Sequence, residues 1–423
     1  MSRNNNLVIK LNCNIVFFWI GFILWLTSML NSLLEVRIFN ADFGLYLSAI
    51  FFLAISNFGI PIKLKKNAIL FSWVGGYMLL LLIATVKSFY VSYSLTIIEN
   101  VILYLSYLML TFFSVRFISY YMYFDKVNRL SIFLLGGFES FILLTKIDIK
   151  VDVLWMIANL FNHHRMRDFC GLNHPNEVGV LSFTVAVLCL VDIFTMNRNI
   201  LLKIFELLFI LNSGLLVLLA ASRAGITSVL CMLVVFFSLC VYSRNNKKVR
   251  ILIIILVILL LFSLAWTIDF EFLFINSNRA ENFLINIPIL LKSKNYFWGM
   301  GIVPGGVFAS RKLGVHTTNV DNYYLYVFLT SGVVGICMLF PQIIRITKEL
   351  INKANEGSIQ SKAILAMFVS LLYYSLFENV FFYPNMISTL VWILSVSSLN
   401  GSQRFKNYET KRESSNNSYS ASI

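Results

Sequence analysis

The sequence predicts an all-α fold, a polytopic integral membrane helical bundle of about 12 transmembrane helices. Apolar residues make up 58% of the 423 residues and charged residues only 13%, and the mean hydropathy is +0.79. These values exclude an ordinary soluble domain. The apolar residues also fall into stretches long enough to cross about 30 Å of hydrocarbon, with polar segments between them.

Each predicted helix corresponds to one apolar stretch. A helix that crosses the bilayer needs roughly 20 mainly apolar residues. The fifth and twelfth stretches are short and interrupted, and only Ser222 and Arg223 separate the seventh from the eighth. In chain order the predicted spans are 15–34, 43–61, 68–86, 97–115, 130–145, 178–195, 204–221, 224–242, 251–268, 322–341, 362–378 and 384–398.

The distribution of cations predicts the topology. A formal net charge of +14 would suggest nucleic acid binding in a soluble protein. Here most of the 34 Lys and Arg fall in segments that are inside when the N-terminus is cytoplasmic, and the short outer loops hold only Arg37, Lys87 and Arg223. Because cytoplasmic loops retain positive charge, we expect a multi-pass cell-membrane protein with both termini cytoplasmic and no nucleic acid partner.

This topology predicts the result of a reporter-fusion experiment. A reporter fused at about Gly314 should be extracytoplasmic, whereas one fused at about Asn246 should be cytoplasmic, because 22 of the Lys and Arg fall in the inner segments and three in the short outer loops. The reverse result at both positions would contradict the predicted outer side.

Two long polar segments are predicted on the outer side, at about 146–177 and between the ninth and tenth helices at 269–321. The second is far longer than a connector needs, and such loops are commonly functional or disordered. We expect one transmembrane unit over residues 1–400. The Ser- and Asn-rich remainder, 401–423, is expected to be a disordered cytoplasmic tail.

The second segment contains a predicted amphipathic helix that could lie in the membrane interface. Asn278 can cap it. Its apolar residues fall near one stripe, while Asn286 and other polar residues face elsewhere. The stripe consists of Phe283, Leu284, Ile287, Leu290 and Leu291.

Charged and amide side chains are concentrated between His163 and Gly179, beside membrane-length apolar stretches. Charged groups next to hydrocarbon are costly and are usually retained for a function. His163 and His164 are adjacent, but no Cys or carboxylate falls at ligand spacing around them. No metal and no other cofactor is therefore expected.

Three blocks in this order resemble the O-antigen polymerase and O-antigen ligase superfamily, which includes capsular and exopolysaccharide polymerases. They are RMRDFCGLNHPNEVG, then LLAASRAG at a helix start, then YFWGMGIVPGG followed by DNYYLYVFLTSGVVG. The resemblance covers residues 165 to 335. Its matching positions are Gly171, Asn173, His174, Pro175, Asn176, Gly179, Ser222, Arg223, Gly299, Gly301, Asp321, Asn322, Tyr324, Leu325, Gly332 and Gly335.

The resemblance implies a glycosyltransferase that works at the outer leaflet on a polyprenyl-diphosphate-linked oligosaccharide, without nucleotide sugar or metal. The further partners that it implies are membrane lipid, a chain-length regulator and a flippase. Ligases of this superfamily tend to have His directly before the Asn of the last block, whereas this chain has Asp321 there and His316 five residues earlier. This departure favours a polymerase over a ligase.

The residues themselves indicate the same chemistry. A lipid diphosphate leaves as an anion, which guanidinium groups bind through paired hydrogen bonds. Candidate bases for the acceptor hydroxyl are His316, Asp321, Asp168 and Glu177. The proposed catalytic residues are His316, Asp321, Arg223 and Arg279, and the proposed substrate-binding residues are Arg165, Arg167, Asn173, His174, Asn176 and Asn322.

Each of these residues also has a structural alternative. Arg223 can anchor its helix at the interface, Arg167 can pair with Asp168, and Asn176 can cap the sixth helix. A transporter or flippase for the same lipid-linked saccharide is the alternative function. A transporter should bury charges in its spans and often has broken helices or repeats. The sequence shows no evident repeat and few charges within its spans, which favours the enzyme.

Overall fold

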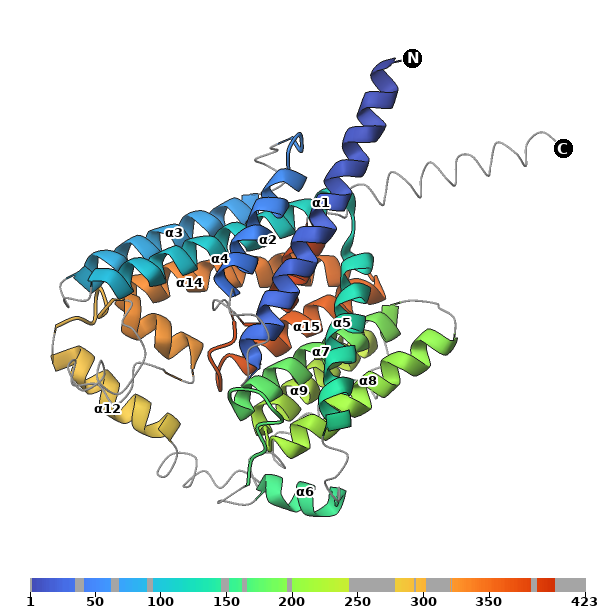
Figure 1. Ribbon diagram of the computed structural model, residues 1–423. Helices are drawn as coiled ribbons and strands as arrows, with labels where there is room; N and C mark the ends of the chain where they lie inside the picture. Colours follow the sequence, from blue (N-terminus) through green and yellow to red (C-terminus); the bar gives the residue numbers. More distant parts are fainter. Residues whose placement is uncertain are drawn as a thin grey trace.

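The computed structural model is nearly all helical in the residues that it describes (Figure 1). Beside the helices, an isolated antiparallel bridge joins Leu34 to Leu172. The described residues are 2–34, 42–61, 68–89, 94–145, 152–161, 166–195, 200–242, 278–292, 294–301, 320, 322–381 and 386–399.

The predicted apolar stretches correspond to helices wherever the structure describes them. The ninth predicted span, 251–268, and the tail 401–423 lie outside the described residues. The helices are α1 Ser2–Leu33, α2 Asp42–Ser56, α3 Ala68–Phe89, α4 Ser94–Tyr121, α5 Phe124–Thr145, α6 Val153–Phe161, α7 Pro175–Thr195, α8 Ile200–Leu219, α9 Arg223–Tyr242, α12 Asn278–Lys292, α14 Tyr323–Asn355, α15 Ile359–Tyr374 and a C-terminal helix Thr389–Leu399.

Within the described residues, 8 helices are long and apolar enough to cross a membrane. The prediction of a multi-pass helical membrane protein is therefore confirmed at this level, while the count of 12 spans stays a prediction. Three further predicted spans correspond to the shorter apolar helices α2, α15 and Thr389–Leu399.

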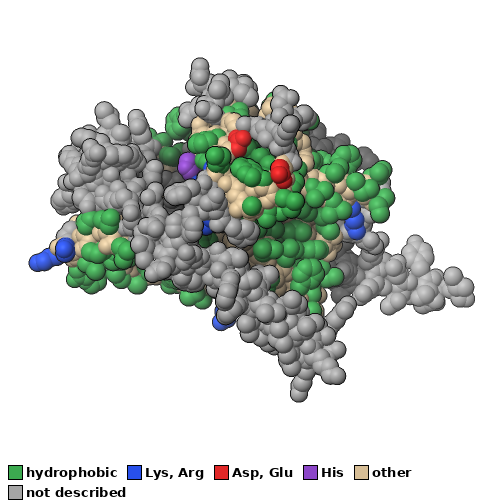
Figure 2. All heavy atoms as spheres, turned by 90° about the horizontal axis from the view of Figure 1, so that it is seen from below, with side chains coloured by type: hydrophobic (Ala, Val, Ile, Leu, Met, Phe, Trp, Pro, Cys, Tyr) green, Lys and Arg blue, Asp and Glu red, His purple; other side chains and the backbone are tan. Residues whose placement is uncertain are grey.

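Helix α8 shows how the sequence suits a lipid environment. Ile200, Leu207 and Leu211 are exposed on its outer side, whereas Glu206 and Ser213 are buried against other helices. This is the reverse of a soluble amphipathic helix, and it is expected where the surrounding solvent is hydrocarbon. Seen from the α6 side, the described surface is likewise mostly hydrophobic (Figure 2).

Helix α7 lies at the centre of the half of the bundle that carries most of the predicted site. It packs against α5, α8, α9 and α15, and most of its residues are buried. Helices α3, α4 and α14 run side by side in the other half (Figure 1). Pairs of helices approach closely at glycines, as at Gly21, where an added Cβ would lie 2.9 Å from the Ala49 carbonyl oxygen of α2.

The predicted helix after Asn278 is present as α12, but its buried side differs from the prediction. Leu290 and Asn286 are fully buried, whereas Leu284 and Leu291 of the predicted stripe are exposed. Leu290 packs in a small cluster with Leu325 and Leu329 of α14. Contact with α14, and not apolar periodicity alone, therefore determines which face of α12 is buried.

Candidate functional site

The site occupies the end of the bundle where α7 and α9 begin and where α8 and α15 end, here called the site end. Residues 166–174 form a loop across it, and this loop is held by the C-terminus of α1. The Asn173 N–H donates to the Leu33 carbonyl at 2.9 Å, and its side-chain amide donates to the Ser32 carbonyl at 2.7 Å. Asn173 therefore anchors the loop to the end of α1 through both its backbone and its side chain.

Helix α6 fixes the other end of the loop through a reciprocal pair of hydrogen bonds. The Asn159 amide nitrogen donates to the Met166 carbonyl at 2.7 Å, and the Met166 N–H donates to the Asn159 amide oxygen at 2.9 Å. Asn159 is buried. Because the Asn159 side chain bonds both the N–H and the carbonyl of Met166, it fixes the backbone position of the residue that precedes Arg167.

Arg167 bridges two parts of the site end. Its Nε donates to the Ala220 carbonyl at 3.1 Å in the turn between α8 and α9, and its Nη2 donates to the Asn176 amide oxygen. The carboxylate of the neighbouring Asp168 accepts from the Cys170 N–H at 2.7 Å. Two acceptors on different parts of the chain, Ala220 and Asn176, thus fix the orientation of the guanidinium plane.

Arg223 is the first residue of α9, as predicted. Its Nε donates to the Leu160 carbonyl near the end of α6 at 2.7 Å. Ala220, the partner of Arg167, lies only three residues before it. One short turn between α8 and α9 therefore brings two of the predicted arginines to the same end of the bundle.

The N-termini of α7 and α9 are in direct contact. A Cβ added to Gly179, in the first turns of α7, would lie 2.2 Å from the Ser222 hydroxyl oxygen that precedes α9. A Cβ on Gly225 would lie 3.3 Å from the Gly179 carbonyl oxygen. Each helix N-terminus carries about half a unit of positive charge, so two adjacent N-termini beside arginines favour an anion.

Asn176 does not cap its helix, contrary to the structural alternative. Helix α7 begins at Pro175, and His174 provides the cap: its Nδ1 accepts from the Asn176 N–H at 3.1 Å and its carbonyl accepts from the Glu177 N–H at 3.0 Å. Proline suits the first helical position because its missing N–H needs no partner there. The Asn176 side chain is left to contact Arg167 and Glu378.

Glu378 is the residue that the sequence analysis missed. It is buried in the turn after α15, and its Oε2 accepts from the Asn176 amide nitrogen at 2.9 Å. The stretch FENVFFYPN places this carboxylate beside apolar sequence, which is the signal that singled out residues 163–179. The same argument could have found it.

The block that begins at Asn322 is bound to the same turn. The Asn322 amide oxygen caps α14 by accepting from the Leu325 N–H at 2.9 Å, and its amide nitrogen donates to the Leu376 carbonyl at 2.6 Å. The Tyr323 N–H donates to the Ser375 carbonyl at 3.1 Å. Residues 375–378 therefore connect two blocks that are far apart in the sequence.

The two glycine blocks of the resemblance also meet, at a break in α14. Gly332 has φ 64° and ψ −159°, which interrupts the helix. The Met300 and Gly301 N–H groups donate to the Leu329 and Thr330 carbonyls, at 2.7 and 3.0 Å.

On the other side of the break, the Val333 N–H donates to the Tyr296 carbonyl at 2.8 Å and the Val334 N–H to the Phe297 carbonyl at 3.2 Å. Residues 296–301 thus bond backbone groups on both sides of the break. Because unpaired backbone groups are costly in hydrocarbon, this pairing allows the helix to break within its apolar part.

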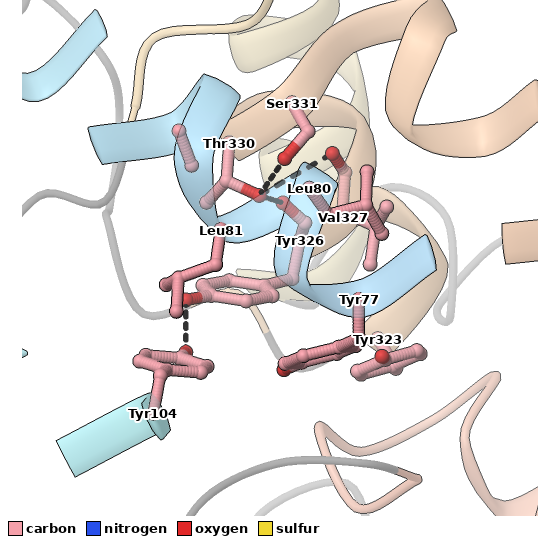
Figure 3. A pocket seen from close by; sticks show the side chains of 10 residues that line it. Tyr77, Leu80, Leu81, Tyr104, Tyr323, Tyr326, Val327, Thr330 and Ser331 are labelled. Carbon is pink, nitrogen blue, oxygen red and sulfur yellow. Dashed lines mark hydrogen bonds between the residues drawn. The ribbon is translucent and has the colours of Figure 1, made fainter. Parts of the chain in front are cut away.

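A small pocket adjoins this break, between α3, α4 and α14 (Figure 3). The Tyr104 and Tyr326 hydroxyls are hydrogen bonded across it, and Thr330 donates to the Tyr326 carbonyl at 2.9 Å. The lining also includes Tyr77, Tyr323 and Ser331. Tyr323 connects the pocket to the turn after α15, but the arginines are not among its lining residues.

The structure thus describes part of the predicted site. It brings Arg167, Asn173, His174, Asn176 and Arg223 to one end of the bundle, and it connects Asn322 to them through residues 375–378. Arg279 lies in the first turn of α12, but its side chain is outside the described part of the structure, as are Arg165, His316 and Asp321. Their predicted roles stay predictions.

No protein-family model matches the sequence, and no curated protein matches it. The resemblance to the polymerase and ligase superfamily therefore rests on the residues of the motifs themselves. Chemically, the described arrangement offers two oriented guanidinium groups beside two helix N-termini, which suits an anionic group better than a neutral one.

Proposed function

We propose that this protein is a polysaccharide polymerase that joins polyprenyl-diphosphate-linked oligosaccharide repeat units at the outer face of the cell membrane. One observation carries the proposal: Arg167 and Arg223 lie near the abutting N-termini of α7 and α9, and each is oriented by a backbone carbonyl, that of Ala220 or that of Leu160. Such a constellation stabilises the charge that develops on a leaving diphosphate, commonly the largest catalytic contribution.

In the proposed reaction, a hydroxyl of the acceptor repeat unit attacks the anomeric carbon of the donor glycan. The bond from that carbon to the diphosphate oxygen breaks, and the lipid diphosphate leaves with the electron pair. A general base accepts the hydroxyl proton. His316 and Asp321 are the proposed bases, and Arg279 is proposed to join the arginines at the diphosphate.

Purified protein given only polyprenyl-diphosphate repeat units should produce a ladder of longer lipid-linked glycans in the presence of chelator. No nucleotide sugar should be needed, because the lipid substrate already contains the activated bond. Gel electrophoresis of the lipid-linked products would show the ladder. His316→Ala should slow its formation by roughly 10² to 10⁴ if that side chain is the base.

Other outcomes of this experiment would contradict the proposal. A product that appears only with an added lipid A core acceptor would identify a ligase. Absence of glycan transfer, together with movement of the saccharide across vesicles that contain the protein, would identify a transporter.

Two observations favour the transporter as the second candidate. Glu139 is fully buried within α5, where its Oε2 accepts from the Ser213 hydroxyl at 2.6 Å, and Asp192 and Glu206 are buried in α7 and α8. Each of the three predicted spans 130–145, 178–195 and 204–221 therefore contains one buried acid, as is expected of a transporter. The break of α14 at Gly332 is likewise a feature of many transporters. The arginines at the site end still favour the enzyme.

A further inference from the structure

The turn after α15 holds Glu378 in a defined position. The Glu378 N–H donates to the Tyr374 carbonyl at 3.0 Å, and the Glu378 carbonyl accepts from the Val380 N–H at 3.0 Å. The residue is only 6% exposed. A carboxylate buried to this extent is costly unless nearby donors compensate it. Loss of the hydrogen bond from Asn176 would therefore destabilise the protein.

Both polar atoms of the Asn176 side-chain amide form hydrogen bonds. Its oxygen accepts from Arg167 Nη2, and its nitrogen donates to Glu378 Oε2 at 2.9 Å. An amide turned by 180° would direct its oxygen at the carboxylate and its NH₂ at the guanidinium. Both contacts would then join like groups, two acceptors and two donors. The carboxylate of Glu378 therefore selects the amide orientation that holds Arg167.

We propose that Glu378 is a positioning residue: its carboxylate orients the Asn176 amide, and this amide, together with the Ala220 carbonyl, fixes the guanidinium of Arg167 for binding a diphosphate. The diphosphate as ligand rests on the proposed function. The orientation of Arg167 by Asn176 and Glu378 does not rest on the proposed function, because it follows from the hydrogen bonds alone.

A reciprocal exchange of the two side chains tests this arrangement. Asn176→Asp should place two carboxylates in contact, whereas Asn176→Asp with Glu378→Gln should restore the bond with donor and acceptor exchanged and leave an acceptor oxygen for Arg167. Glu378→Gln alone, in which the amides can pair either way round, should lie between wild type and Asn176→Asp.

Two measurements on the full chain in detergent report the effect. The first is the rate at which phenylglyoxal modifies Arg167, followed by mass spectrometry. This rate should rise in Asn176→Asp, where the introduced carboxylate and Glu378 repel each other, and fall to the wild-type value or below it in the double variant, where the introduced carboxylate accepts from Arg167 in a charge-assisted bond. The second is the rate of glycan ladder formation, which should fall roughly tenfold or more in Asn176→Asp and recover in the double variant.

The chain contains a matched control at the opposite end of the bundle. There the Gln360 amide nitrogen donates to Asp125 Oδ1 at 3.2 Å, so Gln360→Glu creates the same contact between two carboxylates. This variant should leave both the modification of Arg167 and the ladder unchanged.

The modification rates decide the positioning role even if no glycan is made. Modification of Arg167 that does not respond to Asn176→Asp, or that is not restored in the double variant, would overturn it. A wild-type protein that forms no ladder, with modification rates as expected, would instead reject the proposed function and leave the positioning of Arg167 supported.

Discussion

Replacing Gly332 with alanine is expected to lower the free energy of unfolding by roughly 2 to 6 kcal/mol. Its φ of 64° and ψ of −159° form a backbone conformation that is almost restricted to glycine. An added Cβ would also lie 2.4 Å from the carbonyl carbon and oxygen of Phe297. Residues 296–301 would have to move, which would disrupt their hydrogen bonds to both sides of the break.

Heating the detergent-solubilised variants and measuring the fraction that elutes as a single species would test this prediction. Gly357→Ala is the matched control for backbone strain, because Gly357 has φ 94° but no atom within 4 Å of an added Cβ. It should lower the free energy of unfolding by only about 1 to 2 kcal/mol. If the two variants resisted heat equally, the clash between the added Cβ and Phe297 would not destabilise the protein, and the prediction would be wrong.

Arg223→Lys is expected to reduce glycan transfer by roughly 10² to 10³, the loss seen when one donor to a developing oxyanion is removed. The variant keeps the charge, but lysine lacks both the Nε–H that reaches the Leu160 carbonyl and the planar fork that binds phosphate oxygens in pairs. Arg279→Lys is expected to behave in the same way because Arg279 is proposed to bind the same diphosphate.

Ladder formation by equal amounts of each purified variant is the measurement. Arg345→Lys is a suitable control, because Arg345 is exposed on the second half of α14 and contacts the Ser72 hydroxyl at 3.4 Å. It should form the ladder at the wild-type rate. Full polymer from both Arg223→Lys and Arg279→Lys, at equal expression, would exclude the diphosphate clamp.

Most of the described helices could be predicted because hydrocarbon imposes a minimum length on an apolar helix. Helix α6 could not: its nine residues are too short to cross a membrane, and its place depends on contacts such as that of Asn159 with Met166. The predicted face of α12 was wrong for a related reason: Leu290 packs on α14, and Asn286, one turn before it on the same side of the helix, is buried as well. Periodicity does not report the partner that a helix packs against.

The candidate site was predictable where chemistry is local and not where it depends on distant contacts. Arg223 at a helix start could be read directly from the short sequence between two apolar spans. The role of Asn176 could not, because His174 takes the capping position and Glu378 lies 202 residues further along the chain. Glu139 was overlooked because a single acid within an apolar stretch does not change the prediction of a span.

The contacts of residues 173–176 have a consequence for biosynthesis. Asn173 is bonded to carbonyls at the end of the first helix, whereas Asn176 is bonded to Glu378, which is translated shortly before the C-terminal helix Thr389–Leu399. Membrane insertion proceeds from the N-terminus as the ribosome translates, so α1 can bind Asn173 before half of the 423 residues are made, whereas Asn176 has no Glu378 to bind until residue 378 is translated. A nascent chain that stalls before Glu378 would contain Arg167 without the carboxylate that orients Asn176 toward it.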